Sequence, residues 1–186
     1  MNTQAHARER AEHWSQQAEN DPGSARARFN LGLAYTEMGR VNDAEKAYMA
    51  ALELDPDLVE AWVNLGGVRL LRWDFQGCLE ATQEAVARRD DLVIAHFNMG
   101  QAHLYLGHAA ELVECNRRAL ALDPRHAAAH YFLAVGLLAA GEVPQARVEL
   151  TQAMRLGHQP STEFLKALER AETAAPSPVP VLEIGQ

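Results

Sequence analysis

The chain has 186 residues, of which 48% are hydrophobic and 23% are charged, and this globular composition excludes a wholly disordered protein. Only 6% of residues are aromatic while alanine is abundant, a balance that favours closely packed helices over sheets. The net charge of −8 argues against nucleic acid as a main partner, and no apolar stretch is long enough to insert into a membrane. The first residues lack the apolar core of a secretion signal, and two cysteines cannot form a disulfide framework. We therefore expect a cytoplasmic protein.

A period of 34 residues organises the chain. Three series recur at this spacing without an insertion: Gly32, Gly66, Gly100 and Ala134; Ala51, Ala85, Ala119 and Ala153; and Pro22, Pro56, Asp90, Pro124 and His158. A sustained period of this length is the signature of stacked supersecondary units, each of which buries its apolar side only against its neighbours.

Each period is predicted to form a helix hairpin. In the first, helical spacing from Ala25 to Met38 breaks at Gly39, resumes from Val41 to Leu54 and ends at Asp55-Pro56. The predicted organisation is an N-terminal helix in residues 1–24, hairpins in 25–58, 59–92, 93–126 and 127–160, a capping helix in 161–173 and an extended, proline-containing tail in 174–186.

These hairpins resemble the tetratricopeptide repeat. The resemblance rests on Trp62-x-x-Leu65-Gly66 followed by Ala85, and on Leu31-Gly32-x-x-Tyr35 followed by Ala44, Tyr48, Ala51 and Pro56. It covers residues 25–160 as four repeats, preceded by a helix that resembles half a repeat. The resemblance implies an all-α fold, a right-handed α-solenoid of antiparallel helix hairpins with a C-terminal capping helix. The general role of the family is to hold other polypeptides in a concave groove.

In this family the first helix of each repeat lines the concave side. The predicted peptide-binding residues are accordingly Phe29, Asn30, Leu33, Val63, Asn64, Phe97, Asn98, Gln101, Tyr105 and Tyr131. Among them, Asn30, Asn64 and Asn98 form a ladder with one asparagine per repeat. An amide side chain carries donors and an acceptor, so it can pair with a peptide backbone of any sequence. The alternatives are that the asparagines brace their own hairpins and that the aromatic residues pack between first helices.

One known ligand type of the family can be compared directly. Adaptors for heat-shock chaperones grip a C-terminal carboxylate with two Lys, two Asn and an Arg from successive repeats. The matching positions here are Phe29, Leu33, Asn64, Ile94 and Asn98, which include no cation. The predicted partner is therefore a protein that presents an apolar or amphipathic segment.

Polar residues interrupt the core positions of the middle repeats in pairs. Arg69 and Thr82 share the second repeat, and His103 and Asn116 share the third. Because an unpaired buried polar group costs about 1–3 kcal/mol, hydrogen-bonded pairs Arg69–Thr82 and His103–Asn116 are predicted.

No motif for nucleotide binding, a zinc protease or a nucleophile elbow is present, so no enzyme, no catalytic residue and no cofactor is predicted. His96, His126 and His130 have no acidic or cysteine residue spaced to complete a metal site, and Cys78 and Cys115 are predicted to be buried thiols.

Two other functions stay open from the sequence. The chain could be a structural protein that self-associates through its groove and its C-terminal tail, or an accessory assembly factor of a larger enzyme complex.

Overall fold

The computed structural model describes residues 3–174, and every regular element in that range is an α-helix. The helices are α1 (Thr3–Asn20), α2 (Ala25–Glu37), α3 (Val41–Leu54), α4 (Val59–Leu71), α5 (Phe75–Arg88), α6 (Val93–Leu106), α7 (Ala109–Leu122), α8 (Ala127–Ala139), α9 (Val143–Arg155) and α10 (Thr162–Ala174). No helix in this range is both long and apolar enough to cross a membrane. The predicted tail, apart from Ala174, lies outside the described residues.

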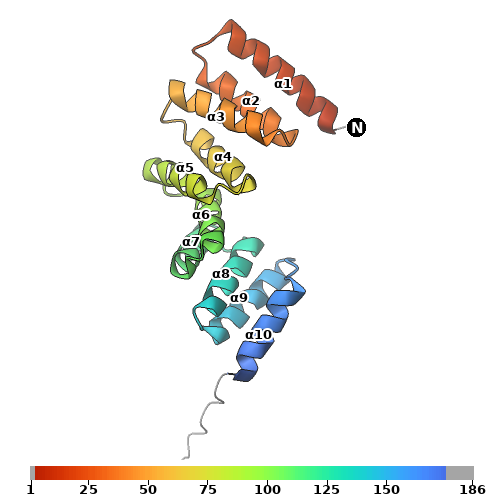
Figure 1. Cartoon of the computed structure of the whole chain (residues 1–186), viewed down its shortest axis with the longest axis vertical. Helices are drawn as coiled ribbons and strands as arrows, with labels where there is room; N and C mark the ends of the chain where they lie inside the picture. The colour runs from red at the N-terminus through yellow and green to blue at the C-terminus, as the bar shows by residue number, and fades with distance from the viewer. Residues whose placement is uncertain (1–2, 175–186) are drawn as a thin grey trace, which may run out of the picture.

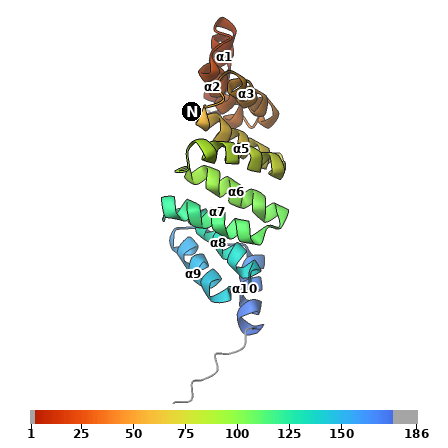
Figure 2. The ribbon, with the colours of Figure 1, turned by 90° about the vertical axis from the view of Figure 1, so that its left-hand side faces the viewer.

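The helices stack into an elongated array in which each packs against the next along the chain (Figure 1). Figure 2 shows α5, α6, α7 and α8 lying side by side along the long axis. The first helices of successive hairpins also touch, since α4 packs on α6, α6 on α8 and α8 on α10. These contacts join α4, α6, α8 and α10 into one wall of the α-solenoid, which confirms the predicted fold class.

Close approach of the two helices in a hairpin depends on the glycines of the 34-residue series. A methyl group placed on Gly32 would lie 2.5 Å from the ring of Tyr48. On Gly66 it would lie 2.5 Å from Thr82 Cγ2, and on Gly100 it would lie 2.6 Å from Asn116 Nδ2. The space that a side chain would need is therefore filled by the second helix of the same hairpin.

The turn inside each hairpin requires a left-handed backbone. Gly39, Gly107 and Gly141 have φ of 70°, 77° and 79° at this position, which suits glycine because it has no Cβ. In the second repeat the same position is Trp73, with φ of 63°. Trp73 is the one non-glycine residue with positive φ in residues 3–174, and its conformation is strained.

The buried core is divided along the array. One cluster joins the first two hairpins around Tyr48 and Leu65, and another joins the last hairpin to α10 around Leu150 and Leu168. The middle cluster is small, consisting of Cys78, Leu79 and Ala102 with partly buried neighbours. The buried polar residues of the described chain, Thr82, His96, Asn98 and Asn116, all belong to these middle repeats. The centre of the array is therefore its least apolar part.

The polar pairs expected in the middle repeats are not what the structure shows. Arg69 Nε lies 3.2 Å from Glu45 Oε1, and Arg69 Nη1 donates to the Gly77 carbonyl at 3.1 Å. Thr82 Oγ1 donates to the Cys78 carbonyl of its own helix at 2.7 Å. The prediction was wrong because a short polar side chain can be satisfied by the preceding helical turn, without a partner on the facing helix.

The third repeat differs from the expected pairing in the same way. His103 Nδ1 lies 3.3 Å from His108 Nδ1, on the turn between α6 and α7. Asn116 Nδ2 donates to the Leu112 carbonyl at 2.8 Å, while Asn116 Oδ1 is buried without a hydrogen-bond partner. The interior of this hairpin thus retains one unsatisfied acceptor.

Candidate peptide-binding groove

A hollow of about 370 Å³ runs along the wall of first helices. It is lined by Thr36 from α2, by Val63, Asn64, Gly67, Val68, Leu70 and Leu71 from α4, and by Ile94, Asn98 and Gln101 from α6. Among the described residues that line it, none carries a charge. A second hollow of about 230 Å³ shares Val63, Asn64 and Ile94 with the first and adds the ionic residues Glu60, Arg89 and Asp91. We call the first hollow the α4–α6 groove.

The amide side chains of the α4–α6 groove come from two successive repeats. Asn64 Nδ2 donates to the Glu60 carbonyl at 2.7 Å, so one of its donors braces its own helix. Asn98 is only 8% exposed and stands beside Gly67, where an added methyl group would lie 3.5 Å from Asn98 Nδ2. Gln101 lies one turn further along α6 and is half-buried. Asn30 is half-buried too but is not among the lining residues.

Apolar side chains in the α4–α6 groove are open to solvent. Leu71 is 64% exposed and Ile94 is 51% exposed, whereas Val63 is half-buried. Leu71 and Ile94 were not among the predicted site residues. Their positions on first helices were a signal in the sequence, but their exposure depends on how neighbouring helices pack, which the sequence does not display.

Four predicted aromatic or apolar residues pack within the array instead of lining the groove. Phe29 is 6% exposed, with its ring centroid 5.8 Å from that of Tyr48. Leu33 packs against the same core cluster. The other two each contact a histidine ring of their own repeat and a phenylalanine ring of the next unit: Phe97 contacts His126 and Phe132, and Tyr131 contacts His158 and Phe164. The structure therefore brings together Val63, Asn64, Asn98 and Gln101, but not these four.

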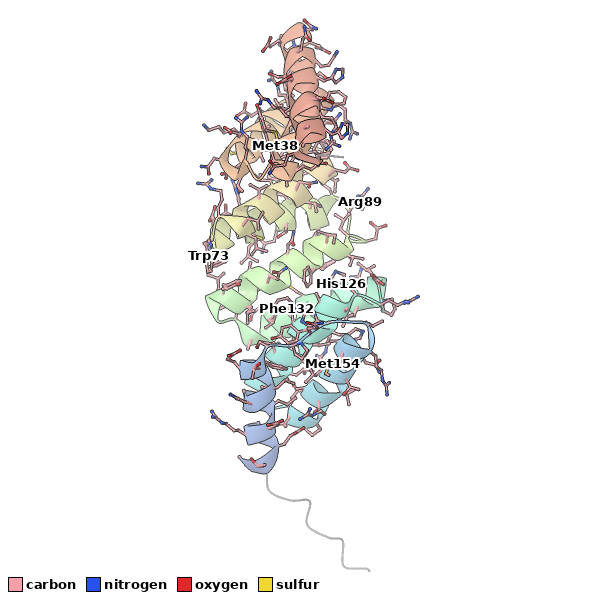
Figure 3. The ribbon with its side chains drawn as sticks, turned by 90° about the vertical axis from the view of Figure 1, so that its right-hand side faces the viewer. Met38, Trp73, Arg89, His126, Phe132 and Met154 are labelled. Atoms are coloured by element: carbon pink, nitrogen blue, oxygen red, sulfur yellow. The ribbon has the colours of Figure 1, made fainter. Side chains whose placement is uncertain are left out.

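The tenth predicted residue, Tyr105, belongs to a different surface. It is 55% exposed and its ring stacks on that of Phe75, with centroids 4.6 Å apart and an interplanar angle of 6°. Trp73 stands edge-on to both rings. Figure 3 shows Trp73 at one edge of the molecule and Arg89, on the rim of the smaller hollow, at the opposite edge.

The groups that could perform chemistry are not among the residues that line the groove. Burial raises the pKa of Cys78 to about 12 and that of Cys115 to about 11, so both thiols stay protonated near neutral pH. In residues 3–174 no three or more His, Cys, Asp and Glu side chains are grouped closely enough to hold a metal ion. Burial also lowers the pKa of His103 and of His158, which favours their neutral forms.

Antiparallel helix hairpins that stack one on the next along the chain define the class of helical-repeat proteins, and an open hollow on such a stack is where the array can hold a ligand. Within this class the chain belongs to the tetratricopeptide repeat family. Family models described as tetratricopeptide repeat match residues 25–58 and residues 97–157.

Two curated relatives share short stretches of sequence with the chain. Superkiller complex protein 3 of Mus musculus is 28% identical over 90 residues, which is 48% of this chain and 6% of that protein. Protein O-mannosyl-transferase TMTC3 of Homo sapiens is 28% identical over 131 residues, which is 61% of this chain and 14% of that protein. The chain thus spans only a small part of each.

Solved structures resemble the array along most of its length. A crystal structure of MamA has a TM-score of 0.75 at 19% identity, covering 84% of this chain and 95% of MamA. YrrB, described as a TPR protein with an unusual peptide-binding site, has a TM-score of 0.72 at 15% identity and covers 88% of this chain and 94% of YrrB. At these identities the likeness establishes the fold. Membership of the tetratricopeptide repeat family supports a role in protein–protein interaction.

Proposed function

We propose that the chain is a non-catalytic cytoplasmic adaptor or scaffold that binds an apolar or amphipathic segment of a partner protein in the α4–α6 groove. The observation that carries this proposal is an uncharged hollow in which two exposed apolar side chains, Leu71 and Ile94, stand beside amide side chains. Exposed apolar surface that is contiguous and edged by polar groups is typical of a partner site.

The two kinds of side chain suit different parts of a ligand. Asn64, Asn98 and Gln101 can pair with the backbone amides of a segment, because each amide offers both donor and acceptor atoms. Leu71 and Ile94 gain by losing water contact, at about 25 cal/mol for each Å² of apolar surface that a ligand covers. A strongly charged segment would be disfavoured, since no described residue of the α4–α6 groove could compensate a desolvated charge. YrrB supports the proposal as a protein of this fold that has a peptide-binding site.

The test uses peptides selected from a phage-displayed random library against the full chain, with affinities measured by isothermal titration calorimetry. Ile94→Ser and the double substitution Asn64→Ala with Asn98→Ala should each weaken binding at least about tenfold. Two control variants match them: Val148→Ser removes an apolar side chain that is 57% exposed on α9, and Asn30→Ala removes the asparagine outside the groove lining.

Both controls should bind as the unmodified chain does. Unchanged affinity in folded groove variants, or selected peptides that are mainly charged, would contradict the proposal.

A further inference from the structure

A second exposed apolar surface lies at the turn edge of the middle repeats. Its members are Trp73 in the α4–α5 turn, Phe75 at the start of α5 and Tyr105 near the end of α6, and we call them the aromatic cluster. The ring centroids are 4.6 Å apart for Phe75 and Tyr105, 5.5 Å for Trp73 and Tyr105, and 6.0 Å for Trp73 and Phe75. Trp73 is 71% exposed and Tyr105 is 55% exposed, so two large rings face solvent although each touches the other two.

The backbone conformation of Trp73 is one in which glycine would be less strained than tryptophan. It occupies the left-handed turn position at which the other three repeats have glycine. The turn hydrogen bonds are the same as in those repeats: Trp73 N–H donates to the Leu70 carbonyl as Gly107 N–H donates to the Leu104 carbonyl. Glycine would therefore form this turn without strain, and backbone strain that persists in a fold is concentrated at functional positions. An exposed tryptophan in this conformation points to a role in binding.

The aromatic cluster is held in position by the core of the middle repeats. Phe75 is partly buried against the middle core cluster of Cys78, Leu79 and Ala102, which holds its ring in place. Tyr105 stacks on that ring, and Trp73 crosses both at interplanar angles of 66° and 60°. Flat rings set at steep angles to one another form the kind of ridged surface on which prolines in a polyproline II helix dock, because the pyrrolidine rings fill the spaces between them.

A segment with that character is present in the chain itself. Residues 176–182 read P-S-P-V-P-V-L, with a proline at every second position from 176 to 180 and no charged residue. Proline fixes φ near the polyproline II value, so such a segment gives up little conformational entropy when it binds.

We propose that the aromatic cluster binds the proline-rich segment 176–182 of a second copy of this chain. The same chain's own segment cannot lie on the aromatic cluster, because Ala175 alone joins the end of α10 to Pro176, and one residue spans only about 3 Å. Even Tyr105, on α6, is two helix-to-helix steps from α10, through α8, at about 8–10 Å each. This contact is independent of the α4–α6 groove, since the aromatic cluster contains no residue that lines the groove.

The contact joins two different surfaces, so each copy carries one site and one ligand segment. The test is sedimentation velocity of the full chain over a range of concentrations. Two variants each remove one half of the contact: Trp73→Gly removes the central ring, and the triple substitution Pro176→Ala, Pro178→Ala and Pro180→Ala removes the prolines. Trp73→Gly restores the residue that the other repeats use, so it is expected to fold, which circular dichroism checks. Met154→Ala, which removes a side chain 51% exposed on α9, is the control.

The unmodified chain and Met154→Ala are expected to associate, and each half-contact variant should associate at least about tenfold more weakly by itself. Mixing the two variants should restore a dimer, because one supplies the aromatic cluster and the other the proline segment. A chain that stays monomeric at every concentration overturns the proposal, as does association that survives in Trp73→Gly. Association that Trp73→Gly abolishes but the triple proline variant retains overturns the assigned ligand.

Discussion

The tight hairpin of the second repeat provides a quantitative test of the packing. A methyl group on Gly66 would lie 2.5 Å from Thr82 Cγ2, while its next nearest atom, the Cys78 carbonyl oxygen, lies 3.4 Å away. Overpacking of this kind costs about 1–3 kcal/mol, against which alanine gains about 1 kcal/mol over glycine in a helix interior. The balance of the two terms is a decrease in the free energy of unfolding of up to about 2 kcal/mol for Gly66→Ala.

The clash comes from a single methyl group, so it can be removed separately. Thr82→Ser deletes Cγ2 but keeps the hydroxyl that donates to the Cys78 carbonyl. Alone, it should cost about 1 kcal/mol for a lost buried methyl group. In the double variant the methyl group introduced by Gly66→Ala takes the vacated space, and stability should return to within about 0.5 kcal/mol of the unmodified chain. The resulting coupling energy is favourable, at about 2 kcal/mol.

The assay is urea unfolding of the four chains followed by circular dichroism at equilibrium. Because repeat arrays can lose two-state behaviour, the transitions should also be followed by tryptophan fluorescence to establish that both probes coincide. Gly67→Ala is the matched control: its methyl group would meet only Asn98 Nδ2 at 3.5 Å, an ordinary contact, so the variant should be neutral or slightly more stable. If Gly66→Ala were as stable as Gly67→Ala, or if Thr82→Ser failed to rescue it, the packing argument would be refuted.

Three further predictions concern buried polar groups. Asn116→Leu should raise the free energy of unfolding by about 1–2 kcal/mol in urea titrations, because it removes a buried acceptor without a partner; a loss of that size would contradict this. At pH 8 a disulfide reagent should modify Cys78 and Cys115 only as fast as the chain opens, since burial raises both pKa values; immediate modification of the folded chain would be the contrary result. The free energy of unfolding should decrease as the pH is lowered from about 7.5 to 5.5. The pKa values of His103 and His158 are lowered in the folded chain, so the unfolded chain takes up protons at a higher pH. His103→Gln should flatten that decline, and an unchanged slope would argue against it.

The fold could be predicted from the sequence because the signals for each helix and turn recur in four successive repeats. The glycine at position 32 of the first hairpin recurs at 66 and 100, and each of these positions lies so close to a second helix that an added methyl group would clash with it. The candidate site was less accessible to the same reasoning. Periodicity assigns a residue to the first helix, but it does not show that Leu71 stays exposed or that Phe29 is buried against Tyr48.

Thr82 and Trp73 illustrate the limits of prediction from the sequence. The predicted Arg69–Thr82 hydrogen bond was wrong because the Thr82 hydroxyl donates to a carbonyl of its own helix. The prediction had considered only partners on the facing helix. Trp73, by contrast, was visible from the start: it interrupts a glycine series at 39, 107 and 141 that has the same 34-residue spacing. A large ring where three repeats have no side chain was a signal for the aromatic cluster.

The division of the core has a mechanical consequence. Two well-filled blocks, one at each end of the array, are joined by a centre whose interior holds four polar side chains. Local opening free energy follows buried apolar contact, so slow amide exchange should mark the ends and faster exchange the centre. The α4–α6 groove lies in that less stable centre, and a segment bound there would reduce local opening of the middle repeats. Ligand affinity and the local stability of the middle repeats are thereby linked, because a ligand that binds only the closed array stabilises it.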